Sequence, residues 1–396
     1  MVSNFTYYTP TEVLFGKDTE HQAGRLVKHY GGTKVLLHYG SNSAKASGLL
    51  DRVEASLKAE GIDYVELGGV VPNPRLSKVH EGIELGKREG VDFILAVGGG
   101  SALDSAKAIA YGIYNEGEVW DFYAGTRKIQ GALPHAVILT IAAAGSEMSE
   151  SSVITNEEGW LKRGVNHASG RCRFAIMNPE LLYTLPEYQT MSGIVDMMMH
   201  TMERYFLIEE SMSLTDELST ALLKNIVHHA HILLENPKDY TARANIMWAG
   251  ALAHNGLTSA GNGSGGDWTC HQMEHELGGL YDVAHGAGLS AVWDSWATYV
   301  YKNKPERFAS FGYEVFDLPK TEDQDADALA AIAATKAFFE SIKMPTTIKA
   351  LGVVPTEEEI LEMADKCSRG ESRTVGSIKA LDRADLEAIY RLALGN

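Results

Sequence analysis

Cysteine is scarce in this 396-residue chain, and its scarcity narrows the classes of protein to which the chain can belong. The three cysteines, Cys172, Cys270 and Cys367, are far apart and odd in number, so we expect no disulfide framework and no Cys-x-x-Cys metal site. No stretch approaches the roughly 18 consecutive apolar residues of a membrane-spanning helix. The first residues lack the basic and apolar segments of a secretory signal. We therefore expect a cytoplasmic protein that does not enter membranes.

Basic residues are also in deficit. The chain has 35 lysines and arginines against 52 aspartates and glutamates, which gives a formal net charge of −17. This charge opposes binding to nucleic-acid phosphates and to anionic membrane surfaces, so we expect neither as a partner. A hydrophobic content of 45% with 22% charged residues is ordinary for a globular protein. At this length we expect two domains, each with its own core.

The first half of the chain alternates apolar segments with amphipathic ones, which is typical of a parallel sheet covered by helices on both faces. Strands are predicted at residues 34–39, 64–67, 93–97, 136–140 and 174–177. From Glu187 onward the apolar residues recur with helical spacing instead. We therefore predict an α/β domain over residues 1–184 and an all-α domain over residues 185–396.

A glycine loop in the first half predicts an anion-binding site. The strand at 93–97 runs into Gly98-Gly99-Gly100-Ser101 and then directly into a helix. Backbone N–H groups at a helix N-terminus have no partners within the helix and can bind a phosphate. The spacing matches neither Gly-x-Gly-x-x-Gly nor a Walker loop, and a glycine turn without a ligand is the alternative. We favour a cradle for a pyrophosphate.

The second half contains four residues of the types that bind metals. Asp196 and His200 are four residues apart on one predicted helix, and His271 opens a second helical pattern that is followed by His285. Residues four apart project from the same face of a helix. Trp268, just before His271, either packs in the core or lines a pocket. One carboxylate and three imidazoles suit a divalent metal that keeps a position open for substrate, without distinguishing iron from zinc.

Two alternatives stay open from the residues alone. The Asp196–His200 pair fits a hydrogen-bonded core contact as well as a metal site. The spacing of His271, Glu274 and His275 also matches the inverted-zincin signature of metallopeptidases, in which both histidines bind zinc and the glutamate acts as the base. The peptidase hypothesis leaves the glycine loop without a role.

In combination these motifs resemble the iron-containing (group III) alcohol dehydrogenases, and within them the NADPH-dependent butanol dehydrogenases and aldehyde reductases. The resemblance covers essentially the whole chain, from Phe15-Gly16 to the C-terminal helices. It implies a Rossmann-like nucleotide-binding domain followed by an all-α metal-binding domain, in the fold shared with dehydroquinate synthase and glycerol dehydrogenase. It also implies a homodimer.

The resemblance assigns roles to particular residues. It implies that Asp196, His200, His271 and His285 bind the metal, Fe²⁺ or Zn²⁺, and that His275 faces the nicotinamide and the substrate, so these five form the catalytic site. The residues that it implies for cofactor binding are Gly40, Ser41, Ser43, Lys45, Gly98, Gly99, Gly100, Ser101, Asp104, Thr140 and Lys162.

Two departures from the family pattern concern the cofactor. Family members carry Ala-Gly-Thr-Gly-Ser-Glu after the fourth strand, and this chain has Ala144 at the threonine position, so one hydroxyl is lost. NAD-preferring relatives place an acid after the first strand, whereas residues 40–45 read Gly-Ser-Asn-Ser-Ala-Lys and Ala46 replaces a second basic residue. Hydroxyls and a lysine accept a ribose 2′-phosphate that a carboxylate repels. The sequence therefore favours NADP(H) over NAD(H).

We therefore predict reversible hydride transfer between NADP(H) and a primary alcohol/aldehyde pair of butanol-like size, at a cleft between the two domains. The metal would lower the pKa of the bound alcohol, and His275 would orient the substrate or relay a proton. The alternatives are a glycerol dehydrogenase, a dehydroquinate synthase-like lyase, a non-catalytic nucleotide-binding protein and, more remotely, the inverted-zincin peptidase. A lyase acting on a phosphorylated sugar acid would need a basic cluster near the histidines, and the sequence has none there.

Overall fold

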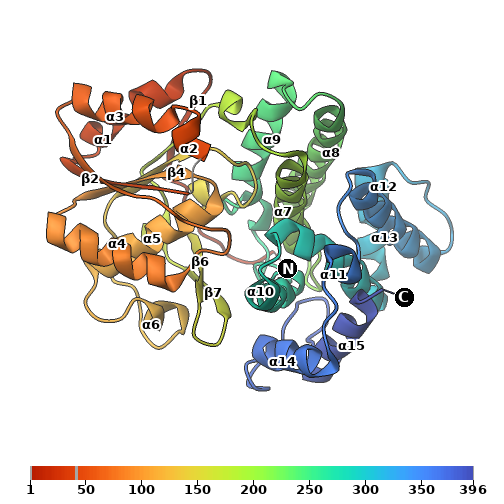
Figure 1. Ribbon diagram of the computed structural model, residues 1–396. Helices are drawn as coiled ribbons and strands as arrows, with labels where there is room; N and C mark the ends of the chain where they lie inside the picture. The colour runs from red at the N-terminus through yellow and green to blue at the C-terminus, as the bar shows by residue number, and fades with distance from the viewer. Residues whose placement is uncertain (1, 41–42, 396) are drawn as a thin grey trace. The chain divides into compact units, whose positions relative to one another are not determined.

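The computed structural model describes residues 2–40 and 43–395. These residues form two compact units (Figure 1): an α/β unit, Tyr8–Leu185, and a helical unit that combines Met1–Tyr7 with Pro186–Asn396. The N-terminal segment is tied to the helical unit, where the Ser3 N–H donates to the Gly261 carbonyl oxygen (3.0 Å). The division based on sequence places that segment in the α/β domain instead.

A six-stranded parallel sheet forms the centre of the α/β unit. Its strands lie in the order β1-β8-β5-β4-β2-β3, and each pair of neighbours is parallel. The sheet contains all five strands that the apolar runs predict. The strands are β1 (Glu12–Phe15), β2 (Lys34–Tyr39), β3 (Asp63–Leu67), β4 (Phe93–Gly98), β5 (His135–Leu139) and β8 (Phe174–Met177).

The sequence does not predict three further strands. β1 has only four residues and lies at the edge of the sheet, where none of its residues is buried. β6 (Ser151–Asn156) and β7 (Leu161–Asn166) form a separate antiparallel pair that carries mainly polar side chains. Short edge strands and polar hairpins lack the apolar run by which a buried strand is found.

Helices cover both faces of the sheet (Figure 1). On one face α1 and α3 pack on alternate strand residues such as Leu37 and Leu95. On the other face α4 and α5 pack together, and α5 contacts β4. Because it is covered on both sides, β4 is buried along its whole length. The helices of this unit are α1 (Ala23–His29), α2 (Ser43–Ala46), α3 (Leu49–Ala59), α4 (Leu76–Glu89), α5 (Gly100–Tyr114) and α6 (Trp120–Tyr123).

The order of the strands reverses between β2 and β4. From β2 the chain moves outward to β3, returns to β4 on the other side of β2, and continues to β5. Open α/β sheets bind their ligands at the carboxyl ends of the strands beside such a reversal. Of the predicted cofactor residues, Gly40 follows β2 directly, and Gly98 ends β4 where the chain passes through Gly99 into α5. The topology therefore brings Gly40 and the glycine loop to the edge of the sheet where such proteins bind ligands.

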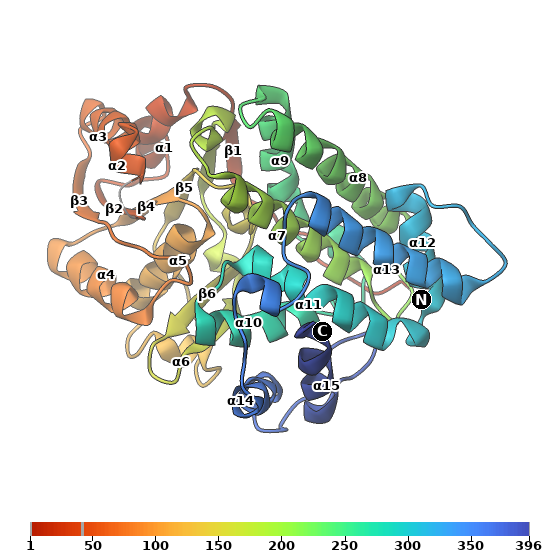
Figure 2. The same cartoon turned by 45° about the vertical axis from the view of Figure 1, so that its right-hand side comes forward.

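The helical unit is built around α7 (Glu187–Tyr205), which contacts α8, α9 and α11 (Figure 2). Every residue of α7 from Thr190 to Tyr205 is buried, so its polar side chains lie in the interior. No helix in the described part of the chain is both long and apolar enough to span a membrane. The other helices are α8 (Ser213–Glu235), α9 (Tyr240–Ala253), α10 (Thr269–Tyr281), α11 (His285–Val300), α12 (Pro305–Phe316), α13 (Gln324–Ser341), α14 (Glu357–Ser368) and α15 (Arg383–Ala393).

A buried polar network fastens α5 to the segment that follows β5. The ammonium group of Lys107 is fully buried and donates to three backbone carbonyls between residues 146 and 151 (2.7–3.0 Å). Asp104, one turn earlier, accepts from Ser146 Oγ (2.6 Å) and from the Val153 N–H (2.9 Å). Buried charges are tolerated when they are paired and hydrogen-bonded. The network therefore holds the segment after β5 against the helix that follows the glycine loop.

Replacing Lys107 with methionine tests this network. Lys107→Met keeps the length of the side chain but leaves three buried carbonyl oxygens without their donor, so we expect the free energy of unfolding to fall by about 3 kcal/mol. Urea denaturation followed by circular dichroism measures the change. Lys87→Met, at an exposed position of α4, is the matched control. Equal stability of both variants and the wild type would show that the network has no structural role.

Candidate metal centre

Three side chains from two helices converge inside the helical unit. Asp196 and His200 lie on α7, and His271 lies on α10. His200 Nδ1 is 3.4 Å and His271 Nε2 is 3.8 Å from the same atom, Asp196 Oδ1. Ligands of one metal in tetrahedral geometry lie roughly 3.4 Å apart when each is about 2.1 Å from the ion. The spacing therefore matches atoms that surround an ion.

The three atoms are buried without a hydrogen bond. Within residues 2–40 and 43–395, no hydrogen-bond partner is found for Asp196 Oδ1, His200 Nδ1 or His271 Nε2. Their side chains are at most 6% exposed. An unsatisfied buried polar atom costs free energy, and three that face one another fit a common cation. One carboxylate oxygen with imidazole nitrogens is a donor set that suits a divalent transition metal.

His285, at the start of α11, lies beside these residues. Its Nε2 is 3.7 Å from Asp196 Oδ1, and its ring centroid is 5.2 Å from that of His271. All four side chains that the sequence marks as metal ligands are thus close together. The side chain of His285 is 26% exposed, which makes this the most accessible side of the group.

His275 lies one turn beyond His271 on α10 and is 9% exposed. Its ring centroid is 6.0 Å from that of His285. In the described residues, the group of close ligand atoms around Asp196 contains His200 and His271 but not His275, whereas His285 Nε2 lies 3.7 Å from Asp196 Oδ1. The arrangement therefore separates the two histidines that the inverted-zincin hypothesis pairs as zinc ligands.

Two buried glutamates orient two of the imidazoles. The Nδ1 atom of His271 donates to Glu203 Oε2, and that of His285 donates to Glu274 Oε2. Both glutamate side chains are fully buried. Each contact turns the Nε2 atom of its imidazole toward Asp196, as carboxylates do behind histidine ligands in metal sites. Glu274, the base in the peptidase hypothesis, is thus occupied with His285.

The sequence does not predict that either glutamate orients an imidazole. For Glu203, however, the spacing in the sequence could have indicated it. Glu203 follows Asp196 by seven residues, two turns along the same face of α7. Its Oε1 also accepts the backbone N–H of Cys270 (2.7 Å) at the start of α10. The same oxygen accepts the backbone N–H of His271 (3.3 Å), so Glu203 joins α7 to α10 through one side-chain and two backbone contacts. Glu274 contacts His285 on a different helix, α11, so no spacing pattern in the sequence predicts this contact.

His254 is a further residue that the sequence does not identify. It follows α9, and its ring centroid is 3.9 Å from that of His200 in an edge-to-face arrangement. The centroid of the Trp268 ring is 5.2 Å from that of His271. An isolated histidine at a helix end has no spacing that connects it with α7, so only the fold brings it to the site.

The electrostatics of the cluster differ from one imidazole to the next. Burial lowers the pKa of His200 well below its usual range, and the neighbouring His254 and His271 lower it further. Burial also opposes a charge on His271, but the carboxylates of Glu203 and Asp196 outweigh it and raise the pKa of His271 to about 9. At neutral pH, His271 therefore carries protons on both nitrogens before a metal binds, whereas His200 is neutral.

In the α/β unit, close packing explains two glycines of the predicted cradle. A Cβ on Gly99 would lie 2.7 Å from Ile141 Cβ, and one on Gly100 would lie 3.1 Å from Ala144 Cβ. Neither glycine has a positive φ, so contact with the segment after β5, not a left-handed turn, requires them. Gly99 is the N-cap of α5 and has no side chain to occupy the first N–H groups of the helix. These groups fit a pyrophosphate.

The described residues among those predicted after β2 lie at the same strand-order reversal as the glycine loop. Gly40 follows the strand, and Ser43 and Lys45 belong to α2, where both are exposed. Ser41 lies outside the described residues. An exposed hydroxyl and an exposed ammonium group are suited to a phosphate ester.

The other predicted cofactor residues have different surroundings. Thr140 follows β5, and its N–H donates to the Gly98 carbonyl oxygen (3.0 Å), which ties together the ends of two central strands. Ser101 is in the first turn of α5, and Lys162 is buried on β7. Both carboxylate oxygens of Asp104 accept protein donors, as described above. Asp104 therefore shapes the segment after β5, and its negative charge is directed at that segment's donors.

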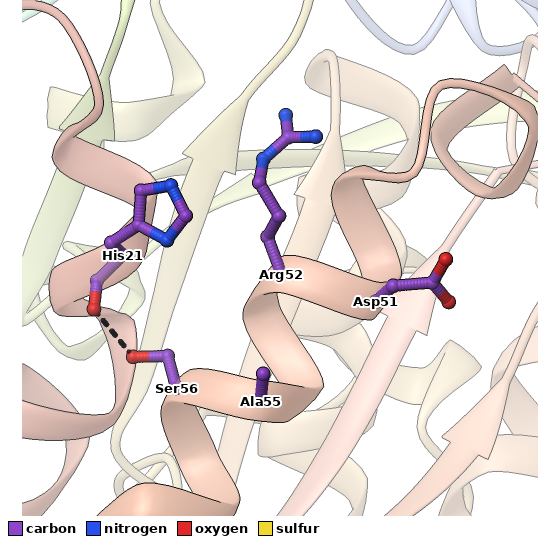
Figure 3. Close-up of a pocket in the computed structure, with 5 residues that line it drawn as sticks. All are labelled: His21, Asp51, Arg52, Ala55 and Ser56. Carbon is purple, nitrogen blue, oxygen red and sulfur yellow. Dashed lines mark hydrogen bonds between the residues drawn. The ribbon is translucent and has the colours of Figure 1, made fainter.

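A cavity of about 420 Å³ lies elsewhere in the α/β unit (Figure 3). It is lined by His21, Asp51, Arg52, Ala55 and Ser56. Ser56 Oγ donates to the carbonyl oxygen of His21 (2.7 Å), and Figure 3 shows the Asp51 carboxylate pointing away from the Arg52 guanidinium. None of the predicted site residues that the structure describes lines this cavity.

Both units match one family of known proteins. Residues 10–179 match the model of iron-containing alcohol dehydrogenases, and residues 190–394 match the C-terminal model of the Fe-containing alcohol dehydrogenase family. The chain belongs to the iron-containing alcohol dehydrogenases. It is by class an alcohol dehydrogenase and thus an oxidoreductase, and Asp196, His200 and His271 form a group that could hold a metal ion.

Individual relatives cover nearly the whole chain. It is 39% identical over 389 residues to NADH-dependent butanol dehydrogenase A of Clostridium acetobutylicum, covering 98% of this chain and 99% of the relative. It is 33% identical over 382 residues to the NADPH-dependent aldehyde reductase YqhD of Escherichia coli, covering 94% and 97%. The crystal structure of NADH-dependent butanol dehydrogenase A from Thermotoga maritima superimposes with a TM-score of 0.95 at 39% identity, covering 100% of this chain and 99% of that one.

The raised pKa of His271 makes metal binding depend on pH. A metal that binds at Nε2 must displace the proton there, so Zn²⁺ binding near pH 7 should release about one proton per ion from His271. The release should decrease as the pH rises past about 9, because His271 has then lost that proton beforehand. Calorimetric titration of metal-stripped protein in buffers of different ionisation enthalpy counts the protons. The same number of released protons near pH 7 and above about pH 9 would contradict the raised pKa of His271.

Proposed function

We propose that this protein interconverts primary alcohols and aldehydes of butanol-like size by hydride transfer to and from NADP(H). The observation that carries the proposal is the group of three buried atoms, on Asp196, His200 and His271, that face one another without hydrogen bonds. A carboxylate and imidazoles in this arrangement suit a metal that acts on a neutral oxygen substrate. Relatives named as butanol dehydrogenases and aldehyde reductases support the choice of substrate class.

Four residues hold the metal in this proposal: Asp196, His200, His271 and His285. A bound Fe²⁺ or Zn²⁺ supplies Lewis acidity, which polarises the substrate oxygen and lowers the pKa of the alcohol. Glu203 keeps the His271 ring directed at the site, and Glu274 does the same for His285. The partial exposure of His285 marks the side from which substrate approaches.

His275 takes part in positioning the substrate. It is nearly buried, it comes from the same helix as His271, and its ring neighbours that of His285. An imidazole at this place can hold the substrate hydroxyl or pass its proton toward solvent. In the α/β unit the uncapped N-terminus of α5 binds the cofactor pyrophosphate, which fixes the nucleotide for hydride transfer.

The choice of NADP(H) depends on the residues that follow β2. Ser43 and Lys45 are exposed there, and residues 40–46 contain no carboxylate that would repel a ribose 2′-phosphate. The named relatives include both kinds of enzyme, since the butanol dehydrogenases are described as NADH-dependent and the aldehyde reductase as NADPH-dependent. The absence of an acidic residue at the ribose end is what supports the choice of NADP(H).

A coupled assay tests cofactor, metal and reaction together. We expect butanal to be reduced with a kcat/KM at least about tenfold higher for NADPH than for NADH, measured by absorbance at 340 nm. Chelation should abolish turnover, and Fe²⁺ or Zn²⁺ should restore it. Asp196→Ala should lose both metal and turnover, because the site loses its only carboxylate ligand, whereas Asp325→Ala, at an exposed position of α13, should not.

Three outcomes decide against the proposal. Full activity of metal-free Asp196→Ala would refute the metal site. Absence of turnover with every alcohol or aldehyde in metal-loaded wild type would refute the reaction. A preference for NADH would refute the cofactor assignment alone and leave the reaction standing.

A further inference from the structure

Trp268 adopts a backbone conformation that its side chain disfavours. It is the N-cap residue of α10, and its φ is 62° in the left-handed region. A bulky residue in that region is strained and persists only where the surroundings impose the conformation. Strain of this kind is concentrated at functional sites, so the reason for it is to be found in what the indole contacts.

Several contacts hold the indole in one position. Trp268 Nε1 donates to the Gly265 carbonyl oxygen (3.1 Å). The guanidinium carbon of Arg204 lies 4.5 Å from the ring centroid, and Arg204 Nη1 donates to the His200 carbonyl oxygen (2.6 Å). A Cβ on Gly266 would lie 2.6 Å from Trp268 Nε1, so only glycine leaves room for the ring there. The ring is therefore fixed to the same helix turn that carries His200.

The fixed ring lies against two of the metal-site imidazoles. Its centroid is 5.2 Å from that of His271 and 6.1 Å from that of His200, with interplanar angles of 69° and 60°. The centroid of His254 is 6.0 Å from it on a third side. Trp268 is only partly buried, whereas His200 and His271 are buried. The indole is thus a rigid apolar surface, partly accessible, next to the atoms that face the proposed metal.

We propose that the indole of Trp268 contacts the hydrocarbon part of the alcohol or aldehyde and limits the chain length and branching that the enzyme accepts. The inference rests on the proposed function, because the metal site must hold the oxygen of such a substrate. A substrate whose oxygen binds the metal held by Asp196, His200 and His271 extends its carbon chain from that point, and Trp268 presents a large apolar surface beside these ligands. An apolar contact of one methylene changes kcat/KM by about tenfold or more.

Two substitutions separate substrate contact from packing. Trp268→Gly removes the ring and suits the backbone, since glycine adopts a positive φ without strain. Trp268→Phe keeps a smaller aromatic ring and loses the indole N–H. Trp248→Ala, which removes an indole that is 40% exposed on α9, is the matched control. Each protein is loaded with zinc, its metal content and thermal unfolding are measured, and kcat/KM is determined for ethanal, butanal, hexanal and 3-methylbutanal.

We expect Trp268→Gly to raise the kcat/KM ratio of 3-methylbutanal to butanal at least about tenfold, mainly through KM, with wild-type metal content. Trp268→Phe should shift the ratio less, and Trp248→Ala should leave it unchanged. An unchanged ratio in folded, metal-loaded Trp268→Gly overturns the inference. Loss of metal in both Trp268 variants also overturns it, because the ring would then serve only to build the site.

A binding measurement keeps the inference testable if the glycine variant does not fold. The fluorescence of the metal-loaded wild type minus that of Trp268→Phe isolates the signal of this indole. We expect 1-butanol to change the difference signal saturably, and no change with 1-butanol overturns the contact. Failure of the proposed function is distinct from both results, since wild type would then reduce none of the four aldehydes.

Discussion

The carboxylate of Asp196 is the constraint on which the helical unit depends. α7 is buried on all sides, so this charge cannot reach water and must be compensated inside the protein. Imidazoles from three helices, α7, α10 and α11, surround one of its oxygens at 3.4–3.8 Å. A cation bound among these atoms would satisfy them together. The packing of the helices and the chemistry of the site thus follow from one buried charge.

The need to compensate buried charge also applies to the residues that surround the site. Two imidazoles have a buried carboxylate behind them, and Glu203 also accepts a backbone N–H of α10, so the residues that orient ligands also join helices. In the α/β unit the buried Lys107 ammonium and the Asp104 carboxylate play a comparable structural part beside the glycine loop. In both units, buried charges are placed where a loop or helix must be held beside a proposed ligand site.

Sequence patterns predict the parts of this protein that local periodicity controls. Continuous apolar runs locate five strands, and the four-residue spacing of Asp196 and His200 places both on one helix face, as found. Sequence patterns do not predict contacts between residues of different helices, such as those of Glu274 with His285 and of His254 with His200. The short edge strand β1 and the polar pair β6–β7 have no apolar run to reveal them. The sequence predicts the glycine loop but not the packing of its glycines against Ile141 and Ala144.

The central claim is that one carboxylate and three imidazoles form a single metal site. X-ray absorption spectroscopy of the zinc-loaded wild type tests it most directly. The account predicts one zinc per chain, only nitrogen and oxygen neighbours at about 2.0–2.1 Å, and the outer-shell scattering of several imidazoles. A sulfur neighbour, a zinc without imidazole scattering, or the failure of the protein to retain zinc would contradict it.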